Sequence, residues 1–261
     1  MLTTLWTSKS GLNANQEKLD VISNNIANVN TTGYKKVNAG FKDLISSSLD
    51  EWGNPLNDKT ATVGSGVKAG NFTKDNSQGG LQTTNQKTDL ALDGEGYFKV
   101  ISSNGTEYYT RDGSFKLDSY GRLVTANGNI LEVQYANGYS QNNTGLTADN
   151  FTINKKGEIF AENNGNFEKV GEIAVYTAVG NDAFTSVGDN LFKELNGVQV
   201  YRTLDADMYQ GYLEASNVDL SQEMTDMIVT QRAFQLSSKG ITAADEMWEM
   251  INNLRSVSYT H

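Results

Sequence analysis

The chain has 261 residues, enough for one large or two modest domains, and a formal net charge of −10. It contains no cysteine, and its one histidine is the last residue, His261. Disulfides, thiolate chemistry and most imidazole chemistry are therefore excluded. An acidic chain without a basic stripe also argues against nucleic acid as a partner.

Both ends of the chain carry apolar residues that repeat every seven positions, a spacing typical of helices that pack lengthwise. The N-terminal repeat is Leu5, Leu12, Leu19 and Ile26, with Ile22 beside it. The C-terminal repeat is Leu220, Met227, Phe234, Ile241 and Trp248, flanked by Met224 and Ile251. Periodicity alone fits the core face of an ordinary globular helix equally well. The position of the two repeats at opposite ends of one chain favours pairing between them.

The first helix is expected over residues 3–27, and Asp219 and Ser221 lie where the second helix needs its cap. Residues 1–45 carry five lysines and three acids, whereas residues 205–256 carry three basic residues and nine acids. These opposite charges favour association of the two ends over self-pairing.

We expect that the first 26 residues do not form a signal peptide, because polar residues interrupt every apolar run and no basic segment precedes one. No window is long and apolar enough for a membrane helix, so we expect a protein that is not membrane-inserted. It either stays in the cytosol or leaves the cell by a route that needs no cleaved signal.

Between residues 71 and 203 the apolar period changes to two, which predicts short strands. The expected strands are residues 97–101, 107–110, 130–135 and 173–177. Asn-Gly or Asp-Gly pairs, which favour hairpin turns, stand at 104–105, 112–113, 127–128, 137–138, 164–165 and 196–197. Before this region we expect a short amphipathic segment over 39–49 and a loop over 50–70.

The predicted fold class is α+β, with N- and C-terminal α-helices paired as a coiled-coil-like terminal domain and a central antiparallel, hairpin-rich β domain. The predicted domains are 1–34 with 214–261 (helical), 35–70 with 204–213 (extended connector) and 71–203 (β). Two paired helices bury each apolar face on one side only, so neighbouring copies are the natural cover. This is a first physical indication of a polymer.

No pattern in the sequence predicts catalysis. The run Asp93-Gly94-Glu95-Gly96 offers two carboxylates but is better explained as a tight turn. Asp112 and Asp118 lack the spacing of a calcium loop. Arg111 and Arg122 flank hairpin turns and are predicted to be solvated. We therefore predict no catalytic, cofactor or metal site, no small-molecule substrate and no enzyme activity.

Four segments resemble the bacterial flagellar rod and hook protein family: SNNIANVNTTGYK (23–35), LALDGEGYF (90–98), YTRDGSF (109–115) and GYLEASNVD (211–219) with its continuation to residue 247. They occur in order from end to end of the chain, and the resemblance is closest to the distal-rod branch. Residues 45–70 look shorter than in that branch. The residues that carry the resemblance are Asn24, Asn25, Asn28, Thr32, Gly33, Asp93, Gly94, Gly96, Arg111, Gly113, Asn217, Gln231 and Arg232.

The resemblance implies a structural subunit of the flagellar basal-body distal rod. Such a subunit polymerises helically into the hollow drive shaft that transmits motor torque to the hook. The implied partners are further copies of the chain, neighbouring rod and hook proteins, the flagellar type III export apparatus and, as candidates, the envelope bushing rings. The implied location is the basal body, outside the cytoplasm and within the cell envelope.

The subunit-assembly seam is predicted to comprise Leu5, Leu12, Leu19, Ile22, Ile26, Met224, Met227, Phe234, Ile241, Trp248 and Ile251. In the free monomer both ends are expected to fray. Asn24, Asn25 and Asn28 either bond to neighbouring subunits or weaken the last turn of the first helix. The alternatives are a proximal rod or hook subunit of the same family, a hairpin-rich surface adhesin and a cytosolic coiled-coil scaffold.

Overall fold

A computed structural model of the chain describes residues 2–44, 46–48, 62–147, 150–163, 165–180, 183–195 and 197–257. Contacts divide the chain into two compact units. The helical unit comprises Met1–Ala27, Val37–Thr73 and Asp219–His261, and the β unit comprises Asn28–Lys36 and Lys74–Val218. Of the two segments expected to form one connector, 35–70 falls mostly in the helical unit and 204–213 falls in the β unit.

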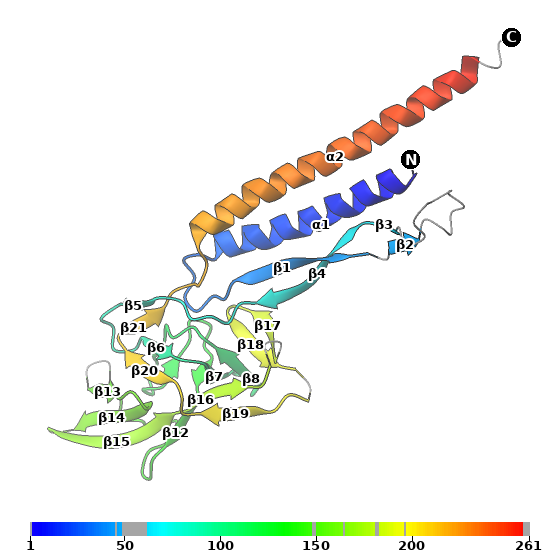
Figure 1. Ribbon diagram of the computed structural model, residues 1–261. Coiled ribbons are helices and arrows are strands. Elements are labelled where there is room, and N and C mark those ends of the chain that lie inside the picture. The colour runs from blue at the N-terminus through cyan, green and yellow to red at the C-terminus, as the bar shows by residue number, and fades with distance from the viewer. Residues whose placement is uncertain are drawn as a thin grey trace. The chain divides into compact units, whose positions relative to one another are not determined.

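Two helices dominate the helical unit: α1 (Leu2–Ala27) and α2 (Leu220–Val257). They lie side by side, and α2 extends beyond the start of α1 (Figure 1). Asp219 caps α2 as predicted, because its carboxylate accepts hydrogen bonds from the backbone N–H groups of Ser221 (2.8 Å) and Gln222 (3.2 Å). Ser221 itself lies inside the helix.

A hairpin of β1 (Val37–Asp43) and β4 (Val67–Lys74) runs along α1 (Figure 1), and β2 (Ser46–Ser48) pairs with β3 (Thr62–Gly64). The expected amphipathic segment over 39–49 and loop over 50–70 are wrong where strands β1 to β4 occupy these residues, whereas residues 65–66, between β3 and β4, do form a loop. Val37 and Ala39 alternate with exposed neighbours, which is the period of a strand. The remainder of that expectation, residues 45 and 49–61, lies outside the described residues.

The β unit contains the remaining strands. They are β5 (Leu81–Thr83), β6 (Leu90–Asp93), β7 (Tyr97–Ile101), β8 (Glu107–Thr110), β9 (Lys116–Leu117), β10 (Leu123–Val124), β11 (Ile130–Leu131), β12 (Val133–Tyr135), β13 (Phe151–Ile153), β14 (Glu158–Asn163), β15 (Asn166–Ile173), β16 (Val175–Ala178), β17 (Phe184–Gly188), β18 (Leu191–Glu194), β19 (Val200–Thr203), β20 (Asp207–Gln210) and β21 (Tyr212–Glu214). The predicted strands over 97–101 and 107–110 are confirmed as β7 and β8.

All the pairings among these strands are antiparallel. The largest sheet runs β17-β18-β8-β7-β11-β10-β9, with β16 joining β7 to β19. A second sheet runs β12-β15-β14-β13, and the pairs β20–β6 and β21–β5 complete the unit. The predicted α+β class, with a helix at each end and an antiparallel β region between them, is confirmed.

Several predicted turns take the backbone geometry that glycine allows. Gly105 (φ +79°) joins β7 to β8, and Gly128 (φ +79°) joins β10 to β11. The predicted hairpin at Asp112-Gly113 is wrong. Gly113 is instead a point of close backbone approach, where its carbonyl oxygen accepts a hydrogen bond from the N–H of Leu90 (3.0 Å).

The core of the β unit gathers apolar side chains from most of its strands around Leu90, Phe98 and Phe115, which are at most 1% exposed. The rings of Phe98 and Phe115 meet edge to face, with centroids 5.4 Å apart. The carbonyl oxygen of Gly113 accepts hydrogen bonds from the N–H groups of both Leu90 (3.0 Å) and Phe115 (2.9 Å), so this backbone contact helps to set the position of the core.

We predict that Gly113→Ala destabilises the β unit by roughly 3 kcal/mol, because the added Cβ would overlap the carbonyl oxygen of Leu90. The matched control is Gly80→Ala, since a Cβ at Gly80 meets nothing within 4 Å. Urea unfolding of the full chain, followed by circular dichroism, measures both. Equal midpoints for the two variants would contradict the assignment of close approach at Gly113.

Candidate assembly surface

The two helices of the helical unit approach each other through small residues. A Cβ added to Gly240 of α2 would lie 2.5 Å from Ser8 Oγ of α1, and one added to Gly11 of α1 would lie 3.2 Å from Ser237 Oγ. Ala244 of α2 is fully buried. Because interhelical distance depends on the side chains at the contact, these small residues let the helices pack closely.

The line of α2 residues that contact α1 is not the predicted apolar repeat. It is a second series of residues seven apart on the same helix, and its members are small or polar. Glu223, Thr230 and Ala244 of this series are buried, and Ser237 is half-buried. The repeat through Met227 lies beside this line. Sequence reasoning missed the line because it scored large apolar side chains, whereas a close helix contact selects small ones.

The predicted seam residues are therefore only partly covered within one copy of the chain. Ile22 is buried. Half-buried are Leu5, Leu12, Leu19, Ile26, Met227, Phe234 and Ile241. Met224, Trp248 and Ile251 are exposed, at 51%, 39% and 39%. Exposed large apolar groups that recur along one helix are the usual mark of an interaction surface.

Asn25 joins three elements of the helical unit. Its side-chain amide donates hydrogen bonds to the carbonyl oxygen of Val37 (2.9 Å) and to Glu223 Oε2 (3.2 Å), and its side-chain oxygen accepts one from the N–H of Val37 (3.1 Å). The carboxamide thus pairs with Val37 as a neighbouring strand would. It fastens the end of α1 to the start of β1 and to the first turn of α2.

A buried ion cluster occupies the β unit close to where the chain enters and leaves that unit. Lys35 Nζ lies 2.7 Å from Glu214 Oε1, and Arg111 NH1 lies 3.2 Å from Glu214 Oε2. All three side chains are at most 4% exposed. Lys35 also donates to the carbonyl oxygen of Ser77 (2.8 Å), and Arg111 NH2 donates to that of Gly94 (2.7 Å).

Burial lowers the pKa of Lys35, and the carboxylate of Glu214 opposes that shift. The carboxylate of Glu214 therefore favours the charged form of the Lys35 ammonium in the interior. The backbone oxygen of Glu214 accepts a hydrogen bond from the N–H of Gly33 (2.8 Å). Gly33 has φ +67°, and a Cβ there would lie 2.7 Å from the backbone of Arg111, so only glycine fits this approach.

Polar side chains around the cluster hold the same strands together. Thr32 Oγ1 donates to Asp112 Oδ1 (2.7 Å), and Asn190 donates to the carbonyl oxygen of Thr32 (2.8 Å). The side-chain oxygen of Asn217 accepts a hydrogen bond from the N–H of Lys36 (2.7 Å). Its side-chain amide donates to the backbone oxygens of Asp75 (2.9 Å) and Ser77 (3.1 Å). The entry segment 28–36 and the exit segment 214–218 are thus bonded to each other and to the hairpins.

The structure brings together Thr32, Gly33, Gly94, Arg111 and Asn217 from the predicted motif residues. The others lie elsewhere. Asp93 ends β6, Gly96 packs on Val175, Gly113 packs on Leu90, Asn28 forms a turn with Thr31, and Asn24, Gln231 and Arg232 lie on exposed faces of helices.

The prediction that Arg111 is solvated is wrong, because Arg111 is 4% exposed and bonded to a carboxylate. Arg122, by contrast, is half-exposed and pairs with Asp118 in a turn. Lys35, Asp112 and Glu214 were missed as site residues although each falls inside a recognised segment. A single charged residue gives no sequence signal of the opposite charge that it meets far along the chain.

Three family models match the chain: flagella basal body rod protein (residues 5–35), flagellar hook protein FlgE/F/G D1 domain (91–161) and flagellar basal body rod FlgEFG protein C-terminal (209–254). The flagellar basal-body rod protein FlgG of Borreliella burgdorferi is 36% identical over 98% of this chain and 99% of its own length. FlgG of Bacillus subtilis is 38% identical over 98% of this chain and its full length. The chain belongs to the FlgG family of flagellar basal-body rod proteins.

A hook-basal body complex protein of Bacillus subtilis, FlhP, is 33% identical over 98% of this chain. The three charged residues of the buried cluster come one from each matched region, since Lys35, Arg111 and Glu214 fall within 5–35, 91–161 and 209–254. In this member of the FlgG family, the ion cluster therefore joins one residue from each of the three matched regions. Neither helix, over its described residues, is long and apolar enough to cross a membrane.

We predict that Glu214→Gln lowers the free energy of unfolding of this FlgG-family chain by roughly 3–5 kcal/mol, because it leaves two buried cations without a counter-charge. Glu194→Gln, which changes an exposed carboxylate of β18, is the control and should cost less than about 0.5 kcal/mol. Denaturant unfolding measures both variants. A cost below about 1 kcal/mol for Glu214→Gln would show that the cluster contributes little.

Lys74 of the β unit supplies a pH-dependent contribution. Its ammonium lies 3.9 Å from the centroid of the Phe192 ring and has no hydrogen-bond partner among the described residues. Desolvation lowers the pKa of Lys74 from 10.5 to about 8. Between these two values the unfolded chain binds a proton that the folded chain has lost, so stability should rise with pH across this window.

We predict that Lys74→Met removes this rise in stability between pH 8 and 10.5. Lys68→Met, which removes an exposed lysine of the same strand, should leave the pH dependence unchanged. Urea midpoints for the three proteins at several pH values provide the comparison. Parallel curves for the wild-type protein and Lys74→Met would contradict the burial of this ammonium.

Proposed function

We propose that this chain is a structural subunit of the distal rod of the bacterial flagellum, and that it has no catalytic role. Its copies assemble helically into a hollow shaft that carries motor torque to the hook. The half-exposed apolar seam on α1 and α2 is the observation that carries this proposal, because one copy leaves these side chains incompletely covered. The family membership supports the same role.

In this proposal the two helices, α1 and α2, line the inside of the shaft, and the β unit forms its outer layer. The seam residues then pack between subunits as well as within one. Burying a large apolar side chain stabilises an assembly by roughly 1.5–3 kcal/mol, and every subunit repeats the contact. Shear between subunits is resisted by many small contributions.

The proposed partners are further copies of the chain, adjoining rod and hook proteins, and the envelope bushing rings. The proposed location is the basal body within the cell envelope, reached through the flagellar export apparatus without a cleaved signal. The likeness to FlhP makes another position in the hook-basal body complex the second candidate. Labelling the chain in purified basal bodies, followed by electron microscopy, separates the two positions.

We predict that Phe234→Asp prevents incorporation into the rod while the β unit stays folded, because a carboxylate replaces a half-buried ring on the seam. Gln235→Asp places the same charge on the exposed neighbouring position and should assemble normally. Basal bodies purified from cells that express each variant give the incorporation, and limited proteolysis tests the β unit. Rods with a wild-type content of Phe234→Asp would refute the seam.

A further inference from the structure

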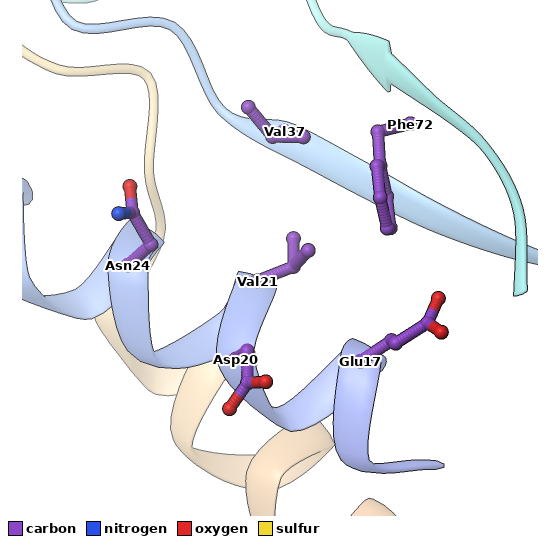
Figure 2. Close-up of a pocket in the computed structure, with 6 residues that line it drawn as sticks. All are labelled: Glu17, Asp20, Val21, Asn24, Val37 and Phe72. Atoms are coloured by element: carbon purple, nitrogen blue, oxygen red, sulfur yellow. The ribbon is translucent and has the colours of Figure 1, made fainter. Parts of the chain in front are cut away.

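A cleft of about 410 Å³ lies in the helical unit between α1 and the β1–β4 hairpin. In Figure 2, Val21 of α1 points toward the strands, and Phe72 of β4 points back toward α1. Val37 of β1 adds to this apolar lining, and Glu17 of α1 reaches toward the strands with its carboxylate (Figure 2). Asp20 lines the edge of the cleft, and its Oδ1 accepts a hydrogen bond from Gln16 Nε2 (3.0 Å). Phe72 is 51% exposed although it stands over an apolar surface, so the cleft is incompletely filled within one copy.

The outer stripe of α2, defined as Val229, Arg232, Leu236 and Lys239, has complementary chemistry. The spacings of three, four and three residues place these side chains on one face of the helix. Val229 and Leu236 are 62% and 68% exposed. Arg232 and Lys239 are the basic residues of α2 up to Ala244, and both belong to this stripe.

We propose that the cleft receives the outer stripe of α2 from a second copy of this chain. Val229 and Leu236 would cover Phe72 and Val21, and the two cations would meet Glu17 and Asp20. One helical turn separates Glu17 from Asp20 and two separate Arg232 from Lys239, a difference that long, flexible basic side chains can span. The inference rests on the proposed function, because it specifies how copies of the chain would assemble.

The stripe of the same copy cannot fill the cleft. The face of α2 that packs on α1 contains Glu223, Thr230 and Ala244. At about 100° per residue, Val229 and Leu236 lie about 100° around α2 from this face, and Arg232 and Lys239 lie about 160° from it, so the stripe is directed away from the contact with α1. Because the donor and acceptor surfaces are different, contact between two copies leaves one stripe and one cleft free. Such a heterologous contact propagates into an open helical polymer.

A charge exchange in the full chain tests this contact. Glu17→Lys with Asp20→Lys should reduce incorporation into basal bodies at least about tenfold, because like charges then face each other across the contact. Arg232→Glu with Lys239→Glu should have a similar effect. The chain with all four substitutions should regain at least about half of wild-type incorporation, since opposite charges meet again.

Two controls make the outcome specific. Glu162→Lys with Glu194→Lys changes the net charge by the same amount on exposed positions of the β unit and should assemble normally. Circular dichroism and thermal melting of each variant monitor folding. Normal assembly of the Glu17→Lys, Asp20→Lys chain, or failure of the fourfold variant to recover while it remains folded, would overturn the inference.

A competing occupant is the pair Trp6 and Lys9 at the start of α1, where the ammonium lies 5.3 Å from the centroid of the indole ring. Recovery of the Glu17→Lys, Asp20→Lys chain by Lys9→Glu, and not by the α2 changes, would identify that pair and overturn our assignment. Absence of even the wild-type chain from basal bodies would instead refute the proposed function.

Disulfide trapping gives a readout that does not depend on charge. The chain has no cysteine, so Val21→Cys with Leu236→Cys introduces the only two thiols. Oxidation of purified rods should give a ladder of covalent multimers, whereas Val21→Cys alone should remain monomeric. A double variant that enters rods but forms no ladder would place the stripe away from the cleft.

Discussion

The pairing of Glu214 with Lys35 and Arg111 is the interaction on which the β unit depends. Removing two cations and one anion from water costs free energy, and the cost is offset only because every charge meets a partner at hydrogen-bond distance. The three residues are far apart in sequence, so their meeting fixes the entry segment, a hairpin and the exit segment together. A buried charge cluster of this kind specifies one arrangement more than it adds stability.

Packing within the helical unit follows a different rule. Glycine, alanine and serine make the contact between α1 and α2, which leaves the larger apolar side chains at its edges. The two helices can therefore pack on each other within one copy and still keep apolar side chains available for contact with neighbouring copies. The same separation holds on the far side of α1, where the hairpin covers part of the helix and leaves Phe72 exposed.

Sequence reasoning found the elements whose patterns are local. The two terminal helices, β7, β8 and the cap at Asp219 follow from short-range spacing and were placed well. It failed where long-range contacts decide the structure. Arg111 looks like a solvated turn residue until Glu214 is brought beside it, and β1 looks amphipathic until its neighbours are known. Small residues at a helix contact likewise carry no apolar signal.

The interleaving of the two units has a consequence for synthesis. The chain crosses between units four times, after Ala27, Lys36, Thr73 and Val218. The partner of the first helix is therefore the last element to be made. At about 5–20 residues per second, ribosomes need roughly 10–40 seconds to reach α2 after α1 has emerged. Throughout that interval α1 has no helix to pack against, so the helical unit can close only after the whole β unit has been synthesised.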